Sequence, residues 1–226
     1  MNQKNEFNKI IQIILDNDLS EKIILIGSWA YYLYCTKLFS KPKELSTLRT
    51  TDIDFYIPRH LRMDKNINVC KILKENGYEH TKDIDGYDRF FSQDFNIEFI
   101  TDEIGAGSNK PYHLKKLNLE IVQLRYTNLL SQNIIEIPFA KNQIIKVPQP
   151  ENFALHKLII ANLRKNKGKT DKDIQQAVDI IKILIQTKQF CKIKELYNQL
   201  PKKWRKRIDK TLETANEFYL KNLIKT

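Results

Sequence analysis

The chain has 226 residues, 42% hydrophobic and 29% charged, with 38 Lys and Arg against 27 Asp and Glu. This composition is typical of a soluble globular protein with a sizeable core, and no apolar run approaches the roughly 20 residues of a membrane-spanning helix. Three cysteines without a CxxC pair argue against a zinc site or a disulfide framework, and they favour a reducing, cytoplasmic setting.

The net charge of +11 is concentrated in the last third of the chain. Residues 150–226 carry 18 Lys and Arg against 8 Asp and Glu, whereas residues 1–149 carry 20 against 19. A basic surface attracts phosphate-rich partners, but lysine-rich surfaces also serve solubility alone. Nucleic-acid binding and plain solvation are therefore both open interpretations of the charge.

Residues 1–148 alternate between strand and helix patterns. An amphipathic helix, and not a signal peptide, is expected at the N-terminus, followed by helices at 28–39 and 63–77. Strands are expected at 22–27, 52–57, 87–93, 95–101, 119–124, 134–139 and 143–148. The pattern predicts an α/β (α+β) fold with a mixed sheet flanked by helices.

From Pro150 the pattern becomes helical. Residues 150–166 have a proline at the helix start, and residues 170–187 open with Thr170 or Asp171 as the expected N-cap. Two further helices complete a C-terminal helical bundle. We therefore expect two domains, residues 1–148 and a basic helical domain of residues 149–226.

The segment "TTDIDFYIP", residues 50–58, places two carboxylates in an otherwise apolar strand. Asp52 and Asp54 are two residues apart, so they point to the same side of the strand. Neighbouring anions repel, and a divalent cation such as Mg²⁺ removes that conflict. The competing interpretation is an edge strand whose aspartates face solvent.

Two further features favour a site. In "LIGSWA", residues 25–30, Gly27 ends a strand and Ser28 opens a helix, which leaves backbone N–H groups for an anion, although an ordinary strand–helix turn has the same pattern. In "NIEFI", residues 96–100, Glu98 lies in an apolar strand and needs a partner or a metal. Glu98 is thus a candidate third carboxylate or general base.

This order of features resembles the nucleotidyltransferase superfamily that includes DNA polymerase beta. Its signature is an apolar strand, Gly-[Gly/Ser], Asp-x-[Asp/Glu] and a third acid on a separate strand. Gly27-Ser28, Asp52-Ile53-Asp54 and Glu98 match it in order, with a longer spacer between Ser28 and Asp52 than in minimal members.

A narrower resemblance, over about residues 22–185, is to bacterial AbiEii-like nucleotidyltransferases and toxins. Their "R-x-T-x-D-h-D" strand is similar to Arg49-Thr50-Thr51-Asp52-Ile53-Asp54, although the threonine here is placed slightly differently or doubled. Further matches are Arg89-Phe90, "PENFALHKL", Arg164, Lys169 and "DKDIQQAVD" (171–179).

The resemblance implies a reaction in which a hydroxyl attacks the α-phosphate of an NTP and pyrophosphate leaves. It implies that Asp52, Asp54 and Glu98 are catalytic and bind Mg²⁺, with two ions expected and Mn²⁺ as a substitute. The expected nucleotide contacts are Gly27, Ser28, Arg49, Thr51, Lys157, Arg164, Lys169 and Lys172. Lys157 and Arg164 are seven residues apart, which predicts one helix face, whereas a solvated basic face is the alternative for these cations.

The densest basic cluster is "PKKWRKR", residues 201–207. Phosphate contacts from Lys202, Lys203, Arg205, Lys206 and Arg207 favour RNA, for example a tRNA-like acceptor, as partner. A toxin role with an antitoxin protein as partner is part of the same expectation, and no membrane is expected. Transfer to a small molecule or protein stays open, as does an inactive nucleotide- or nucleic-acid-binding module.

Overall fold

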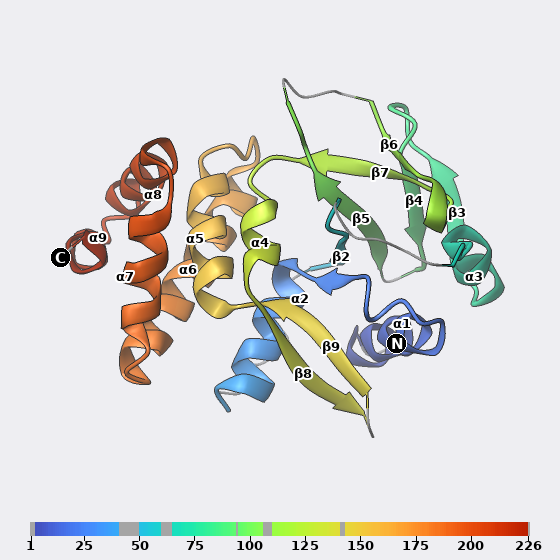
Figure 1. Ribbon diagram of the computed structural model, residues 1–226, viewed down its shortest axis with the longest axis horizontal. Helices are drawn as coiled ribbons and strands as arrows, with labels where there is room; N and C mark the ends of the chain where they lie inside the picture. Colours follow the sequence, from blue (N-terminus) through green and yellow to red (C-terminus); the bar gives the residue numbers. More distant parts are fainter. Residues whose placement is uncertain are drawn as a thin grey trace. The chain divides into compact units, whose positions relative to one another are not determined.

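The computed structural model describes residues 3–40, 50–59, 65–93, 95–105, 110–140 and 143–225. The chain divides into two compact units, Met1–Val147 and Pro148–Thr226. The first unit contains a mixed sheet with helices, and the second is helical (Figure 1). The predicted fold class, a mixed sheet flanked by helices and followed by C-terminal helices, is confirmed. Arg49, a predicted site residue, lies outside the described residues.

The first unit is organised around a mixed sheet whose described strands run in the order β1-β2-β5-β4-β3, with β7 pairing both β5 and β6. Strands β2 and β5 are parallel neighbours in the middle of this sheet (Figure 1). The strands are β1 (Ile24–Leu25), β2 (Asp52–Tyr56), β3 (Glu79–Lys82), β4 (Asp88–Phe91), β5 (Asn96–Asp102), β6 (Tyr112–Leu114) and β7 (Leu119–Leu124). A separate pair is formed by β8 (Ile134–Ala140) and β9 (Gln143–Pro148).

Short helices flank the sheet. They are α1 (Gln3–Asp16), α2 (Gly27–Leu33) with its π-helical extension η1 (Tyr34–Leu38), α3 (Val69–Glu75), the 3₁₀ turn η3 (Lys115–Leu117) and α4 (Asn128–Gln132). The apolar face of α1 meets α2 where Phe7 stacks on Trp29, with ring centroids 4.0 Å apart. Both rings are fully buried, and each such side chain contributes roughly 1.5–3 kcal/mol to folding. This packing fixes α2 relative to the first helix.

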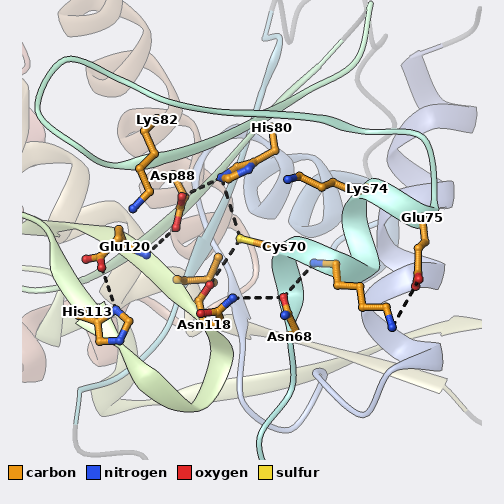
Figure 2. Close-up of a pocket in the computed structure, with 12 residues that line it drawn as sticks. Asn68, Cys70, Lys74, Glu75, His80, Lys82, Asp88, His113, Asn118 and Glu120 are labelled. Carbon is orange, nitrogen blue, oxygen red and sulfur yellow. Dashed lines mark hydrogen bonds and ion pairs between the residues drawn. The ribbon is translucent and has the colours of Figure 1, made fainter.

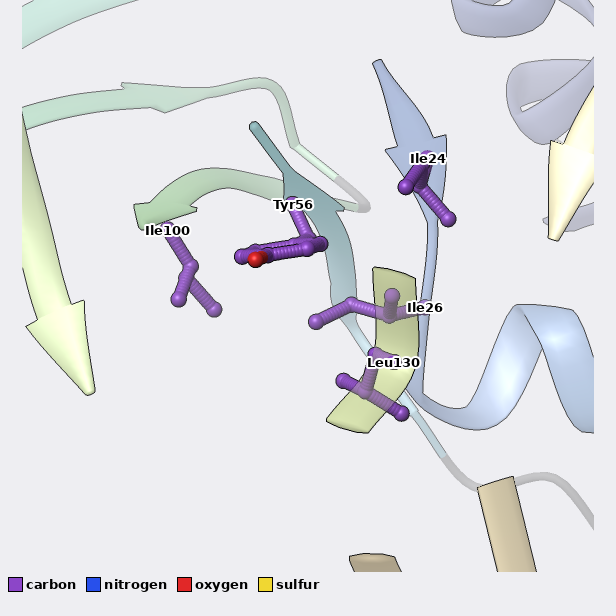
Figure 3. Close-up of a cluster of buried hydrophobic side chains, with 5 residues drawn as sticks. All are labelled: Ile24, Ile26, Tyr56, Ile100 and Leu130. Atoms are coloured by element: carbon purple, nitrogen blue, oxygen red, sulfur yellow. The ribbon is translucent and has the colours of Figure 1, made fainter. Parts of the chain in front are cut away.

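A second apolar cluster holds the ends of the central strands together (Figure 3). The Tyr56 hydroxyl donates a hydrogen bond of 2.7 Å to Asp102 on β5, and burial raises the pKa of Tyr56. Because β1 pairs with β2 within this cluster, the turn after β1 is held close to β2. The members are Ile24, Ile26, Tyr56, Ile100 and Leu130.

Four elements of the first unit are not predicted by the sequence patterns: β3, β6, the 3₁₀ turn η3 and α4. Strand β3 reads "EHTK", which is polar and mostly exposed, so it gives no apolar alternation to detect. The helix expected at 63–77 begins only at Val69, because the Asn68 side chain accepts a hydrogen bond from the Lys71 amide and caps it there. Residues 63 and 64 lie outside the described ranges.

The second unit consists of α5 (Pro150–Ala161), α6 (Lys167–Gln186), α7 (Phe190–Gln199), α8 (Lys202–Thr214) and α9 (Phe218–Lys225). Its core includes Phe153, Leu158, Ile181, Ile208 and Leu212, all buried.

Two predictions about these helices are wrong. Helix α5 ends at Ala161 and not at 166, because the backbone tightens into i→i−3 hydrogen bonds from Leu163 and Arg164. Helix α6 begins at Lys167, capped by Asn166 and not by Thr170 or Asp171. The Asn166 side chain accepts from the Lys169 amide at 3.1 Å.

Candidate active site

The acids predicted from the sequence lie on two neighbouring strands. Strands β2 and β5 run parallel, with Asp52 opposite Asn96 and Asp54 opposite Glu98. The intervening Ile53 and Ile97 are buried, whereas the acids are half-buried, so the acids occupy the more open face of the sheet. The register thus brings Asp54 and Glu98 side by side, although 43 residues separate them in the chain.

Gly27 lies directly against Asp54. The Ile26 amide donates to the Asp54 carbonyl at 3.0 Å, and Gly27 turns the chain with a positive φ of 68°. A Cβ added at Gly27 would lie 2.2 Å from Oδ2 of Asp54. Only glycine fits there, since it accepts the left-handed conformation and leaves room for the carboxylate. Ser28 follows as a buried residue of α2.

Arg89 holds the carboxylate of Glu98. Its Nη1 donates to Oε1 of Glu98 at 2.6 Å, and its Nε donates to Oδ2 of Asp83 at 2.8 Å. Burial opposes ionisation of Asp83, but its hydrogen bonds with Arg89 and nearby backbone amides, with the Arg89 charge, lower its pKa. The guanidinium therefore bridges two carboxylates and fixes Glu98 beside Asp54. The sequence resemblance includes Arg89 but predicts no partner for it.

Asn96 is a further residue on this face. Its side-chain amide donates to Oδ1 of Asp52 at 3.2 Å, and its backbone amide donates to the carbonyl of Thr51 at 2.7 Å. Thr51 lies exposed just before β2, directly before Asp52 in the chain. Asn96 was missed, yet it precedes Glu98 by two residues, so strand alternation alone places both on one face.

In the second unit, Lys157 and Arg164 converge on one carboxylate. Lys157 Nζ lies 2.5 Å from Oδ1 of Asp173, and Arg164 Nε lies 3.0 Å from Oδ2. The prediction that Lys157 and Arg164 share one helix face is wrong, because α5 ends at Ala161. Arg164 lies in the following turn and reaches Asp173 from there. Burial alone raises the pKa of Asp173, but Lys157 and Arg164 outweigh it and lower the pKa.

The remaining predicted cations lie at helix starts in the second unit. Lys169 is exposed and Lys172 half-buried in the first turns of α6. The basic cluster occupies the start of α8, where Lys202, Lys203 and Lys206 are exposed while Arg205 and Arg207 are half-buried. The Arg205 guanidinium lies 5.9 Å from the ring centre of Tyr197. These exposed lysines are accessible to an anionic partner.

The open face of β2 and β5 offers a donor set of carboxylate and amide oxygens. Such hard oxygen ligands suit Mg²⁺, which binds through one or two carboxylates and completes its shell with water and phosphate. The Gly27 backbone lies directly against the Asp54 carboxylate, and a side chain at this position would collide with it. The carboxylates of Asp52 and Asp54 are therefore of the kind that suits a divalent cation.

The mixed sheet with its flanking helices is consistent with a nucleotidyltransferase-like fold. The chain is similar to the crystal structure of an antigenic nucleotidyltransferase-like protein from Paracoccidioides brasiliensis, with a TM-score of 0.52 and 13% identity over 95% of this chain and 91% of that chain. A family model described as nucleotidyltransferase matches residues 5–200. The chain belongs to this nucleotidyltransferase family, which confirms the superfamily resemblance.

No curated protein matches the sequence. Among the described residues, every helix is too short or too polar to cross a lipid bilayer.

Proposed function

We propose that this chain transfers a nucleoside monophosphate from an NTP to a hydroxyl group of RNA. The observation that carries the proposal is the β2–β5 register, which sets Glu98 beside Asp54 while Gly27 lies against the same aspartate. The reaction joins the acceptor oxygen to the α-phosphorus and breaks its bond to the bridging oxygen, so that pyrophosphate leaves. The proton of the hydroxyl passes to a base.

In this proposal the acids of β2 bind the metal, and the acid of β5 accepts a proton or shares the metal. Asp52 and Asp54 hold Mg²⁺, which neutralises charge on the triphosphate when bound. Glu98, oriented by Arg89, takes the proton of the attacking hydroxyl or shares the metal. Gly27 and Ser28 contact the β- and γ-phosphates through the turn between β1 and α2. The catalytic domain spans residues 1–148.

The cations of residues 149–226 are assigned to phosphate binding. Lys157, Arg164, Lys169 and Lys172 are the proposed phosphate contacts of this helical unit, and the first two are already paired with Asp173. The exposed lysines of α8 bind the RNA backbone, supported by the excess of 18 basic over 8 acidic residues after position 149. A cytoplasmic toxin that modifies tRNA-like RNA and is neutralised by an antitoxin protein is the biological role we infer.

The experiment is a transfer assay with each α-labelled NTP, Mg²⁺ and either total RNA, a protein extract or small hydroxylated acceptors. We expect label in RNA from the wild type and none from Asp52→Ala or Asp54→Ala. Asp16→Asn, an exposed carboxylate at the end of α1, serves as the matched control and keeps activity. Label only in protein or in a small molecule would replace RNA as the acceptor.

A second candidate function rests on the ion pair between Arg89 and Glu98. A third acid already neutralised by a guanidinium is also what a nucleotide-binding module without catalysis would contain. In that case NTP binds in the presence of Mg²⁺, but no acceptor is labelled. The transfer assay combined with NTP-binding measurements separates the two functions.

A further inference from the structure

A thiol, an imidazole and a carboxylate meet at the edge of the sheet, away from the acids of β2. Cys70 lies on α3, His80 on β3 and Asp88 at the start of β4. Their ligand atoms all lie within 4.8 Å of one another. Among the described residues, this is the group of three His, Cys, Asp or Glu side chains that lie close enough together to hold one metal ion. Figure 2 shows the three side chains pointing toward one another from the helix and the hairpin.

Both neighbours of His80 approach the same ring nitrogen. Nε2 lies 2.7 Å from Oδ1 of Asp88 and 4.0 Å from Sγ of Cys70. A ring nitrogen has one in-plane position, filled by a proton or by a lone pair. A Cys-His-Asp catalytic unit instead uses the two ring nitrogens, one toward each partner. The geometry therefore points to a shared ligand position and not to a nucleophile with its base.

The Cys70 thiol is half-buried, and its sulfur lies near both His80 and a backbone carbonyl. Cys70 donates weakly to the carbonyl of Asn118 at 3.4 Å. A thiol in these surroundings becomes a thiolate when a metal displaces its proton.

The surroundings of the cluster have the other parts of a metal site. Oδ2 of Asp88 accepts a hydrogen bond of 2.6 Å from the Glu120 amide on β7, which orients the carboxylate from behind. A cavity of about 430 Å³ opens beside the cluster, lined also by Lys74 and Lys82. It provides an entry path and room for a ligand that the protein does not supply.

We propose that Cys70, His80 and Asp88 bind a zinc ion, with a water molecule from the cavity in the fourth position. Thiolate and imidazole ligands favour zinc over magnesium. Usual zinc–ligand distances place neighbouring ligand atoms about 3.3–3.8 Å apart in a tetrahedron, so Cys70 and His80 need only a small approach. The distance between His80 Nε2 and Asp88 Oδ1 has to increase by about 0.6 Å from its present 2.7 Å to admit the ion.

A zinc ion bound at this site would link α3 to the β3–β4 hairpin. Asp88 directly precedes Arg89, whose guanidinium holds Glu98, so the ion would anchor the strand that orients the third acid. The zinc proposal does not depend on nucleotidyl transfer, because none of its ligands belongs to the candidate active site. It also revises the expectation from cysteine spacing that the chain has no zinc site.

The test is cobalt substitution in the full-length chain. We expect a thiolate-to-cobalt charge-transfer band at one ion per chain, and one equivalent of zinc in protein purified without chelators. Cys70→Ser and His80→Gln should lose the band, while the control Cys191→Ser, an exposed free cysteine, keeps it. Asp52→Ala should also keep it, which separates this site from the magnesium site.

Wild-type protein that takes up neither metal would overturn the proposal, as would a Cys70→Ser variant with an unchanged band. If Cys70→Ser does not fold, the wild type still decides. Removal of zinc by a chelator should lower its melting temperature by several degrees, and added zinc should restore it. A melting temperature unaffected by both treatments would contradict a bound ion in this position.

Discussion

Gly27 and Asp54 are so close that the glycine has no room for a side chain: a Cβ there would lie 2.2 Å from the Asp54 carboxylate. The contact links the turn after β1 to the acid strand β2, and it explains why the glycine and the aspartates occur together. It also gives the most local test of the site.

Gly27→Ala should abolish nucleotide binding and destabilise the fold by about 1–3 kcal/mol, since strain at positive φ adds to displacement of Asp54. Gly77→Ala is the matched control, because Gly77 also has a positive φ but nothing within 4 Å of an added Cβ. Gly77→Ala should lower the free energy of unfolding through backbone strain alone and leave NTP binding unchanged. Equal effects of both variants on binding would show that Gly27 does not shape the site.

Arg89→Lys should lower kcat roughly tenfold to a hundredfold while leaving KM for the NTP nearly unchanged. Lysine keeps the positive charge, but a single ammonium cannot replace the two nitrogens that hold Asp83 and Glu98 separately. The stability change should stay within about 1 kcal/mol, because these ion pairs are partly exposed. Steady-state kinetics with urea unfolding measures both, and a variant with unchanged kcat contradicts a positioning role.

Stability should depend on pH through His156. Burial, assisted by the Lys157 charge, lowers its pKa to about 3, whereas the unfolded imidazole titrates near about 6.5. Below about pH 6.5 the His156 imidazole is therefore protonated in the unfolded chain but stays neutral in the folded chain. The free energy of unfolding should then fall by up to about 1.4 kcal/mol per pH unit until about pH 3.

His156→Gln should remove this slope, because glutamine does not titrate. The control His113→Gln changes a half-exposed imidazole and should preserve the slope. Urea unfolding between pH 7 and pH 5 is the measurement. A wild type whose stability is flat across this range would mean that His156 titrates normally in the folded chain.

RNA binding should depend on the exposed lysines of α8. Replacing Lys202, Lys203 and Lys206 by Gln should weaken RNA binding. It should also lower the slope of log Kd against log salt concentration by about 2. Lys65, Lys115 and Lys116 are exposed lysines of the first unit, and the same triple change there should have little effect. Identical slopes for both triple variants would remove α8 from the RNA interface.

The features of the fold and of the candidate site that depend on residues close in sequence could be predicted, whereas those that depend on residues far apart in sequence could not. The alternation of Asp52, Ile53 and Asp54 predicts a shared face, because strand geometry is local. The pairing of Asp54 with Glu98 depends on strand register, which the chain order suggests but does not determine. Asn96 needed only the same alternation applied to β5.

The misreadings have a common origin in long-range contacts. A spacing of seven suggested one helix face for Lys157 and Arg164, but the helix ends between them and Asp173, from α6, collects both cations. Close cysteine pairs are the local sequence pattern that indicates zinc ligands, whereas Cys70, His80 and Asp88 come from a helix and two strands. Their spacings follow no local motif, so only the fold brings them together.

The decisive measurement is calorimetric titration of the wild type and Asp54→Asn with a non-reacting NTP analogue, with and without Mg²⁺. If β2 and β5 form the nucleotide site, the wild type binds only with Mg²⁺, and Asp54→Asn binds at least tenfold more weakly while Asp16→Asn is unchanged. Binding that is independent of Mg²⁺ and of Asp54, or no binding at all, would contradict a nucleotidyltransferase site on this face of the sheet.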